Sequence, residues 1–193
     1  MVTPNKTVTI GTQTWMAENL RTTKFKDGTS IPNVTGSDDW GALTTGAYCN
    51  YANATNVDTI ATYGRLYNWY AANSGLLAPK GWHVPTDAEW TTLINYLGGE
   101  DVAGEKLRES GTTHWPRSPY TSGTNELGFT SLPGGSRDSY GRFDYFGSFG
   151  YWWSATEYAT VKAWLRIDYF NDPDIYREKF YKEMGYSVRC VRD

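Results

Sequence analysis

The chain has 193 residues, of which 18 are basic and 21 are acidic, so its formal net charge is −3. We expect residues 1–193 to form a single domain, because this length is enough for one hydrophobic core. The chain lacks the basic excess that nucleic-acid binding needs, and no apolar run is long enough for a transmembrane helix. Aromatic residues make up 16% of the chain and all hydrophobic residues only 39%, so rings supply much of the apolar surface.

The N-terminal third of the chain predicts a hairpin, a loop region and a helix. Residues 8–17 contain two short β-type runs that meet at Gly11, which is typical of a hairpin. Residues 22–56 are rich in Gly, Asn, Asp and Thr, so we expect a long loop region with short strands at most. Residues 64–74 place apolar side chains at helical spacing before Gly75, which predicts a helix.

The helix expected to begin after Thr86 has the strongest local pattern. Thr86 and Glu89 have the spacing of a capping box, in which each side chain accepts a hydrogen bond from the other residue's backbone N–H. Apolar residues then recur at every third or fourth position up to Leu97, and Gly98 ends the run. A third, shorter helix is predicted over residues 103–109.

The second half of the chain changes to strands and turns. Residues 129–132 are apolar and lead into a strong turn at residues 133–135, Pro-Gly-Gly. Residues 162–170 alternate between two faces, and residues 175–182 can return as the partner strand. Residues 186–191 are typical of a final strand. We therefore expect an α+β fold, with helices first and an antiparallel meander after them.

Cysteine and histidine are scarce. Cys49 and Cys190 are the only cysteines, and His83 and His114 are the only histidines. The usual ligand spacings of a zinc site are absent. The two cysteines either form one long-range disulfide, if the protein is exported, or are buried free thiols.

Six segments resemble a known family of domains. They are residues 13–20 (QTWMAENL), 64–72 (GRLYNWYAA), 79–90 (PKGWHVPTDAEW), 132–135 (LPGG), 151–157 (YWWSATE) and 185–191 (GYSVRCV). In this order they resemble the Fibrobacter succinogenes major paralogous domain family, which is common in surface proteins of Bacteroidetes. That family is similar to the C-type lectin-like fold, in the version shared with formylglycine-generating enzymes. The resemblance implies two helices packed on a twisted antiparallel sheet with long loops, and export, often as a lipoprotein.

The resemblance also concerns Cys190 and the history of the aromatic residues. Relatives usually carry Cys where this chain has Ala78, so a Cys190 that normally pairs there has lost its partner.

Some proteins of this fold are diversified by retroelements that mutate adenines, which turns Asn codons into Tyr, Ser, Phe or Asp codons. Residues at positions that relatives often fill with Asn are compatible with such a diversity-generating retroelement: Tyr145, Phe146, Ser148, Phe149, Asp168, Phe170, Phe180 and Tyr181.

The residue types present do not form a recognisable catalytic constellation. Ser154 and His83 could supply a nucleophile and a base, but a histidine beside a tryptophan before a helix is typical of a packed structural residue. Formylglycine-generating enzymes use cysteines in an exposed cleft, whereas Cys190 lies on an expected core strand. The acidic residues show no spacing that pairs two carboxylates. We predict no enzyme activity, and an enzyme of formylglycine-generating or hydrolytic type is the alternative.

Calcium is the one ion that the sequence brings into consideration. Asn171, Asp172 and Asp174 supply oxygen ligands near one turn, which makes them weak calcium candidates. The other interpretation is that Asn-Asp-Pro-Asp has good turn chemistry. Without the lectin motifs that read carbohydrate through calcium, we expect no cofactor.

Aromatic residues between positions 140 and 181 indicate a binding face. Many of them stand in Gly-flanked sequence that a small core cannot absorb, and one face of residues 162–170 combines rings with Arg and Asp. Such mixtures are typical of recognition surfaces, because rings give large contact area at low entropic cost. The candidate ligand-binding residues are Tyr140, Tyr145, Phe146, Phe149, Tyr151, Tyr158, Trp164, Arg166, Asp168, Phe170, Phe180 and Tyr181.

We therefore expect an exported binding module of adhesin or receptor type. Its ligand would be a protein or carbohydrate on a cell or phage-target surface, with no nucleic-acid partner and no direct membrane span. The module would be extracellular or on the cell surface, with its signal or anchor upstream and outside this chain. A purely structural surface domain is the other alternative, favoured if fewer than about three aromatic residues of the predicted face are exposed.

Overall fold

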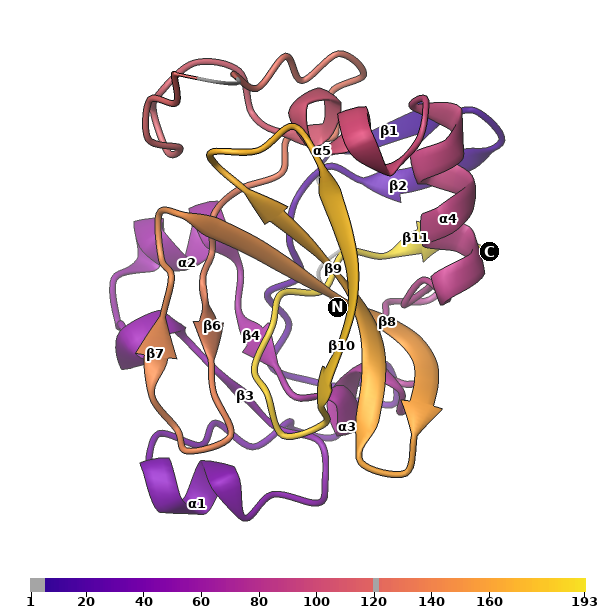
Figure 1. The fold of residues 1–193 in the computed structure, drawn as a ribbon. Helices are drawn as coiled ribbons and strands as arrows, with labels where there is room; N and C mark the ends of the chain where they lie inside the picture. Colours follow the sequence, from indigo (N-terminus) through magenta and orange to yellow (C-terminus); the bar gives the residue numbers. More distant parts are fainter. Residues whose placement is uncertain (1–5, 120–121) are drawn as a thin grey trace.

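The computed structural model describes residues 6–119 and 122–193, and Figure 1 shows helices and short sheets around a sheet of long strands. The predicted α+β class is confirmed. The helices are α1 (Ser37–Gly41), α2 (Val57–Tyr63), α3 (Trp69–Ala72), α4 (Asp87–Tyr96) and α5 (Glu100–Leu107), with a 3-10 turn over Tyr51–Asn53. The strands are β1 (Thr7–Ile10), β2 (Gln13–Met16), β3 (Tyr48–Cys49), β4 (Leu66–Tyr67), β5 (Trp82–His83), β6 (Ser136–Arg137), β7 (Phe143–Asp144), β8 (Phe149–Ala159), β9 (Lys162–Tyr169), β10 (Ile175–Tyr181) and β11 (Val191–Arg192).

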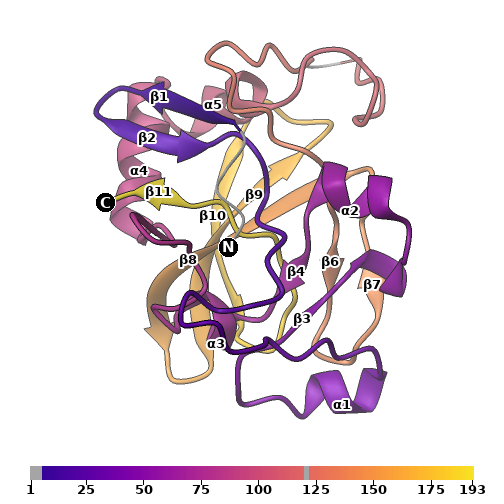
Figure 2. The ribbon, with the colours of Figure 1, turned by 180° about the vertical axis from the view of Figure 1, so that it is seen from behind.

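The predicted N-terminal hairpin is confirmed. β1 pairs antiparallel with β2, and Gly11 turns the chain with a φ of +59°. A Cβ atom at Gly11 would lie 2.8 Å from the Tyr96 ring, so both the backbone conformation and the space require glycine. On the other side of β2 lies β11, with Val191 opposite Trp15, and β5 completes this sheet. The first and last strands therefore flank β2, as Figure 2 shows.

The longest strands, β8, β9 and β10, form one antiparallel sheet with β9 in the middle. The strands predicted over residues 162–170 and 175–182 are confirmed within one residue at each end. One face of β9, which includes Leu165, packs with Trp153 in the main hydrophobic core. The opposite face, which includes Arg166, packs under α4, and α5 covers part of β10. The central strand β9 thus has packed residues on both faces, whereas β10 is mostly exposed.

Helix α4 begins as its capping box predicts. The Thr86 hydroxyl accepts from the Glu89 backbone N–H at 3.2 Å, and the Glu89 carboxylate accepts from the Thr86 backbone N–H at 2.8 Å. The apolar face of α4 packs against the N-terminal hairpin, where the Trp15 and Trp90 ring centroids are 4.7 Å apart. The third helix is also confirmed, although α5 spans Glu100–Leu107 rather than residues 103–109.

The helix predicted over residues 64–74 is wrong in its first half. Leu66 and Tyr67 form β4, which pairs with β3, and the Tyr67 backbone N–H donates to the Tyr186 carbonyl at 2.8 Å. Only the single turn of α3 is helical, and the Asn68 side chain caps it by accepting from the Ala71 N–H. Long-range pairing of the backbone has therefore overridden the local helical spacing.

The predicted final strand is much shorter than residues 186–191, because continuous strand pairing in this part of the chain is confined to β11. Tyr186 and Ser187 make isolated bridges with Tyr67 and Trp152. The Arg189 guanidinium is buried and donates to the Phe129 and Thr130 carbonyls and to Asn19. Burial lowers the pKa of Arg189 to about 9, although the charge of Glu18 opposes this shift.

The loop region predicted over residues 22–56 is confirmed, with only short elements inside it. A buried arginine holds its centre in place. Arg137 donates to the carbonyls of Val34, Thr35 and Gly36 at 2.6 to 3.0 Å, and its guanidinium lies 4.6 Å from the centroid of the Trp40 ring. The loop is therefore part of the packed structure.

Both cysteines are buried free thiols, so the Cys49–Cys190 disulfide, one of the two alternatives considered from the sequence, is not formed. Burial raises the pKa of Cys49 to about 12 and raises that of Cys190 further. Because the thiolate is the reactive form, neither side chain is placed for thiol chemistry.

Candidate functional site

The residues predicted to bind ligand divide by exposure. Five of the predicted rings are exposed, with fractions from 38% for Phe146 to 75% for Tyr140; the other three are Tyr145, Tyr158 and Tyr181. Phe149, Trp164, Phe170 and Phe180 are half-buried. The number of exposed rings exceeds the threshold of about three below which a purely structural role would be favoured.

Three of the predicted residues are buried, and this corrects their assignment to the surface. Tyr151 packs in the main core and stacks on Tyr186 with ring centroids 4.9 Å apart. Arg166 lies under α4 and donates to the Asp87 carboxylate at 2.7 Å. Asp168 accepts from Ser131 at 2.5 Å and from Arg108, both of which are also buried. The Arg and Asp residues of β9 therefore form ion pairs within the protein and do not face a ligand.

The surface of greatest interest is formed by Tyr145, Phe149, Tyr169 and Phe170, and we call it the ring surface. Phe149 and Tyr169 are cross-strand partners on β8 and β9, and their rings stack with centroids 4.4 Å apart. The Tyr145 ring lies 5.0 Å from Phe149, and the Phe170 ring lies 4.9 Å from Tyr169. Four rings from three chain segments thus make one connected array.

A tight turn before β8 presents the exposed end of the ring surface. Tyr145 has a φ of +65°, which an L-residue adopts only at a cost in free energy. The turn is fixed by hydrogen bonds from the Phe149 N–H to the Tyr145 carbonyl at 3.0 Å and from the Gly147 N–H to the Pro133 carbonyl at 2.9 Å. The backbone therefore fixes the direction in which the Tyr145 side chain leaves the turn, and this side chain is 56% exposed.

The neighbouring Phe146 extends the aromatic contacts away from the ring surface. Its ring centroid is 4.6 Å from those of Tyr51 and Tyr63. These two tyrosines were not predicted, because they lie far from residues 140–181 in the chain. Tyr169 was not predicted either, because the alternation of residues 162–170 places it on the apolar face of β9. The alternation was correct, but that face leaves the core at the end of the strand, where Phe149 stacks on Tyr169.

The other predicted rings lie apart from the ring surface. Trp164 contacts Tyr158 at 4.9 Å between centroids, and the Arg177 guanidinium lies 3.6 Å from the centroid of the Trp164 ring. Lys162 lies over the Tyr181 ring at 4.8 Å, Tyr140 contacts Arg142, and Phe180 packs against the main core. These side chains have cationic or core neighbours of their own.

The turn considered for calcium is held by hydrogen bonds of its own. The Asp172 carboxylate accepts from the Asp174 N–H at 3.1 Å and from the Tyr176 hydroxyl at 2.7 Å, and Asn171 accepts from Ser118 at 3.0 Å. The bond from Tyr176 lowers the pKa of Asp172. Within residues 6–119 and 122–193, no group of three or more His, Cys, Asp and Glu side chains could hold a metal ion.

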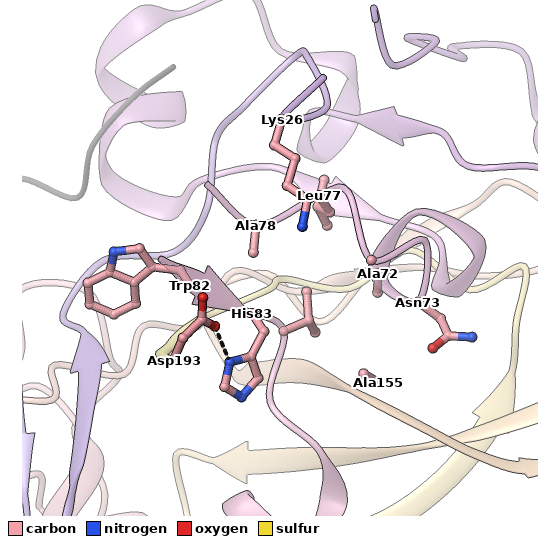
Figure 3. A pocket seen from close by; sticks show the side chains of 11 residues that line it. Lys26, Ala72, Asn73, Leu77, Ala78, Trp82, His83, Ala155 and Asp193 are labelled. Atoms are coloured by element: carbon pink, nitrogen blue, oxygen red, sulfur yellow. Dashed lines mark hydrogen bonds and ion pairs between the residues drawn. The ribbon is translucent and has the colours of Figure 1, made fainter. Parts of the chain in front are cut away.

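A hollow of about 240 Å³ beside β5 contains His83 (Figure 3). His83 Nδ1 lies 2.8 Å from the Asp193 carboxylate, and its Nε2 lies 2.7 Å from Glu89. Burial opposes protonation of this histidine, but the two hydrogen bonds outweigh it and raise its pKa. Among the described residues that line the hollow, none carries a hydroxyl or a thiol. His83 therefore links β5 to α4 and to Asp193 through hydrogen bonds. The described residues that line the hollow supply no nucleophile for it to activate.

The family of the chain follows from comparison with known proteins. The sequence profile of the Fibrobacter succinogenes major domain matches residues 8–192, and the chain belongs to that family. Searches of curated proteins and of solved structures return no match. In the part of the chain that the structure describes, no helix has the length and apolar character needed to cross a membrane.

Proposed function

We propose that this protein is a non-enzymatic binding module whose ring surface holds a protein or glycan ligand. The observation that carries the proposal is the exposed Tyr145 ring, held in a strained backbone conformation and connected to Phe149, Tyr169 and Phe170. Strain of this kind persists where the surrounding structure fixes it, and it concentrates at functional positions. Rings that are already fixed lose little entropy when a ligand binds.

The two ligand classes would use the ring surface differently. A protein ligand would insert an apolar or cationic side chain against the Tyr145 and Phe149 rings, as at the hot spots of protein interfaces. A glycan would lay the C–H face of a sugar on the same rings. The hydroxyls of Tyr145 and Tyr169 could serve as hydrogen-bond donors or acceptors in either case.

Binding to glycan and protein arrays tests the proposal. We expect Tyr145→Ala and Phe149→Ala to weaken the strongest interaction by at least about tenfold, because central aromatic residues dominate interface energy. Tyr158→Ala and Tyr181→Ala are matched controls, since they remove exposed rings outside the ring surface. Circular dichroism would verify that each variant is folded. Unchanged binding by both ring-surface variants would show that ligands bind elsewhere.

We also infer that the fold is C-type lectin-like. Support comes from the sheet in which β11 lies between β2 and β5, and from helices α4 and α5, which pack on a separate antiparallel sheet. An experimental structure with a different strand order in either sheet would contradict this inference.

We further propose that the protein is displayed on the cell surface, as in the surface proteins that its motifs resemble. Protease treatment of intact cells should then remove the domain while a cytoplasmic marker survives. A neighbouring reverse-transcriptase gene with a near-duplicate of the 3′ coding region would support diversification of the ring surface by a retroelement. Protection of the domain in intact cells would contradict surface display.

A further inference from the structure

A second surface feature lies far from residues 140–181 in the sequence. A groove of about 410 Å³ is lined by Arg21, Thr22, Thr23, Lys24, Phe25, Lys26, Gly28 and Arg65. Four of these residues are cationic and none is acidic, although the whole chain has a net charge of −3. The groove is therefore a local reversal of the overall charge, and it favours an anionic ligand.

The two lysines carry most of the charge that a ligand could reach. Lys24 and Lys26 are exposed, and neither forms a salt bridge within the described residues. Arg21 has Glu18 as a distant partner, 3.7 Å away. Asp27 is the acidic residue of the same loop, and its carboxylate accepts from the backbone N–H and the hydroxyl of Thr29. The carboxylates of Glu18 and Asp27 offset part of the cationic charge, but the four cations that line the groove outnumber these two carboxylates.

The backbone of the groove is fixed before any ligand arrives. The Phe25 N–H donates to the Thr29 carbonyl and the Ile31 N–H to the Thr23 carbonyl, both at 2.9 Å, which closes a small hairpin. The Tyr67 hydroxyl donates to the Thr22 carbonyl at 2.7 Å.

Arg65, which also lines the groove, is fixed as well. Its Nε donates to the Arg21 carbonyl at 3.0 Å, and its guanidinium lies 4.8 Å from the centroid of the Tyr48 ring. A preorganised groove reduces the entropic cost of binding.

The groove adjoins the hollow that contains His83, because Lys26 lines both. Figure 3 shows the Lys26 side chain extending toward Leu77 in that hollow, where Asn73 adds an amide and where the Asp193 carboxylate is bonded to His83. Phe25 offers a half-buried ring among the cationic side chains. Cations for charged groups, hydroxyls and an amide for polar groups, and a ring for C–H faces are together the chemistry that fits an acidic sugar chain.

We propose that the groove of residues 21–28 and Arg65 binds an acidic saccharide through sulfate or carboxylate groups. Lys24 and Lys26 pair with the anionic groups, and Phe25 contacts a sugar face. The site does not depend on the ring surface, since the two share no residue.

Calorimetry with a chondroitin sulfate tetrasaccharide at low salt tests the proposal. We expect binding that weakens as salt is raised, and no comparable binding of the neutral cellotetraose. The double variant Lys24→Ser/Lys26→Ser should lose at least about tenfold in affinity. A desulfated tetrasaccharide separates the two anionic groups: retained binding assigns the lysines to carboxylate, and lost binding assigns them to sulfate.

The matched control is Lys80→Ser/Lys179→Ser, which removes the same charge from exposed positions outside the groove. It should bind as the unmodified protein does, and so should Tyr145→Ala, which tests the ring surface instead. Equal loss in both lysine pairs would reveal only non-specific attraction and would overturn the proposal. So would equal binding of cellotetraose, or no binding of either acidic tetrasaccharide.

Discussion

Among single residues, Tyr145 combines strain with exposure. Tyr145→Gly and Tyr145→Ala both remove the ring, but only glycine accepts the φ of +65° without strain. We therefore predict that the glycine variant is more stable than the alanine variant by about 1 kcal/mol. Urea unfolding of the two variants measures the difference.

The same pair of substitutions at Phe146 is the control for this prediction, because Phe146 is not among the residues with positive φ. There alanine should be the more stable variant, since glycine has the larger conformational entropy to lose on folding. If glycine were no better than alanine at Tyr145, the turn would not be strained in solution.

His83 predicts a pH dependence of stability. Hydrogen bonds to Asp193 and Glu89 raise its pKa above the ordinary 6.5 despite partial burial. The contribution of His83 to the free energy of unfolding is therefore fully present below pH 6.5 and is lost as pH rises through the folded-state pKa of this histidine. We expect His83→Gln to cost less than about 1 kcal/mol at a mildly acidic pH, because the side chain is 38% exposed, and to cost less still in alkali.

Denaturant unfolding of both proteins across pH tests this expectation. At low pH the stabilisation by the His83–Glu89 pair is limited by protonation of Glu89. Burial would raise the pKa of Glu89, but its hydrogen bonds with Thr86 and His83 outweigh burial and lower that pKa. The contribution of Glu89 is lost as pH falls through that lowered value. A difference between the two proteins that grows in alkali would show that His83 is not held as an imidazolium.

At the scale of elements, an ion pair fixes helix α4 on the sheet. Asp87, the first residue of α4, accepts from the buried Arg166 on β9 at 2.7 Å and from Arg177 on β10 at 2.8 Å. These bonds outweigh partial burial and lower the pKa of Asp87, whereas burial lowers the pKa of Arg166. The helix N-terminus adds a favourable field for the carboxylate.

We predict that Asp87→Asn destabilises the protein by about 3 kcal/mol, because it leaves the Arg166 charge buried without a counterion. Arg177→Met, which removes the exposed partner of the same carboxylate, should cost less than about 1 kcal/mol. Chemical unfolding of both variants compares the two losses of unfolding free energy. Equal losses would indicate that water solvates the Arg166 charge when Asp87 is removed.

Elements whose signals are local were predictable from the sequence. The capping box of α4, the hairpin at Gly11 and the alternation of β9 each depend on residues close in the chain. The helix over residues 64–74 failed because Tyr67 bonds to Tyr186, and no local pattern reports a partner so distant.

The ring surface was predictable only in part. Composition predicted Tyr145, Phe149 and Phe170. The alternation of β9 shows which residues share a face, but it does not show at which residue that face stops being buried. Tyr169 was therefore missed, and Arg166 and Asp168 were placed outside. The partners of the two charged residues, Asp87 and Arg108, lie about 60 or more positions away in the chain. Such ion pairs are visible only in three dimensions.

At the scale of the whole molecule, the aromatic excess serves two purposes. Trp15, Trp90 and Trp153 are fully buried and connect the helices to both larger sheets. Accessible rings remain at one end of the β8–β9 pair in the ring surface, and Tyr158 and Trp164 form a separate accessible pair farther along the same two strands. A fold whose core is built from rings can thus vary its surface rings without losing those that hold it together.

The position of β1 and β11 on either side of β2 has a mechanical consequence. Both strands run antiparallel to β2, so they run in the same direction as each other. Tension applied between Thr7 and Arg192 therefore pulls them in opposite senses along β2. The hydrogen bonds that join the strands lie across this force, and they must break together rather than one at a time.

We predict that pulling from these two positions in a force spectrometer gives a higher unfolding force than pulling from residue 7 and residue 16. The second geometry peels β1 from β2 one bond at a time, since Thr7 pairs with Met16. Equal forces in the two geometries would contradict the prediction. A domain loaded in shear between its first and last strands can therefore carry tension along a chain that continues on both sides of it.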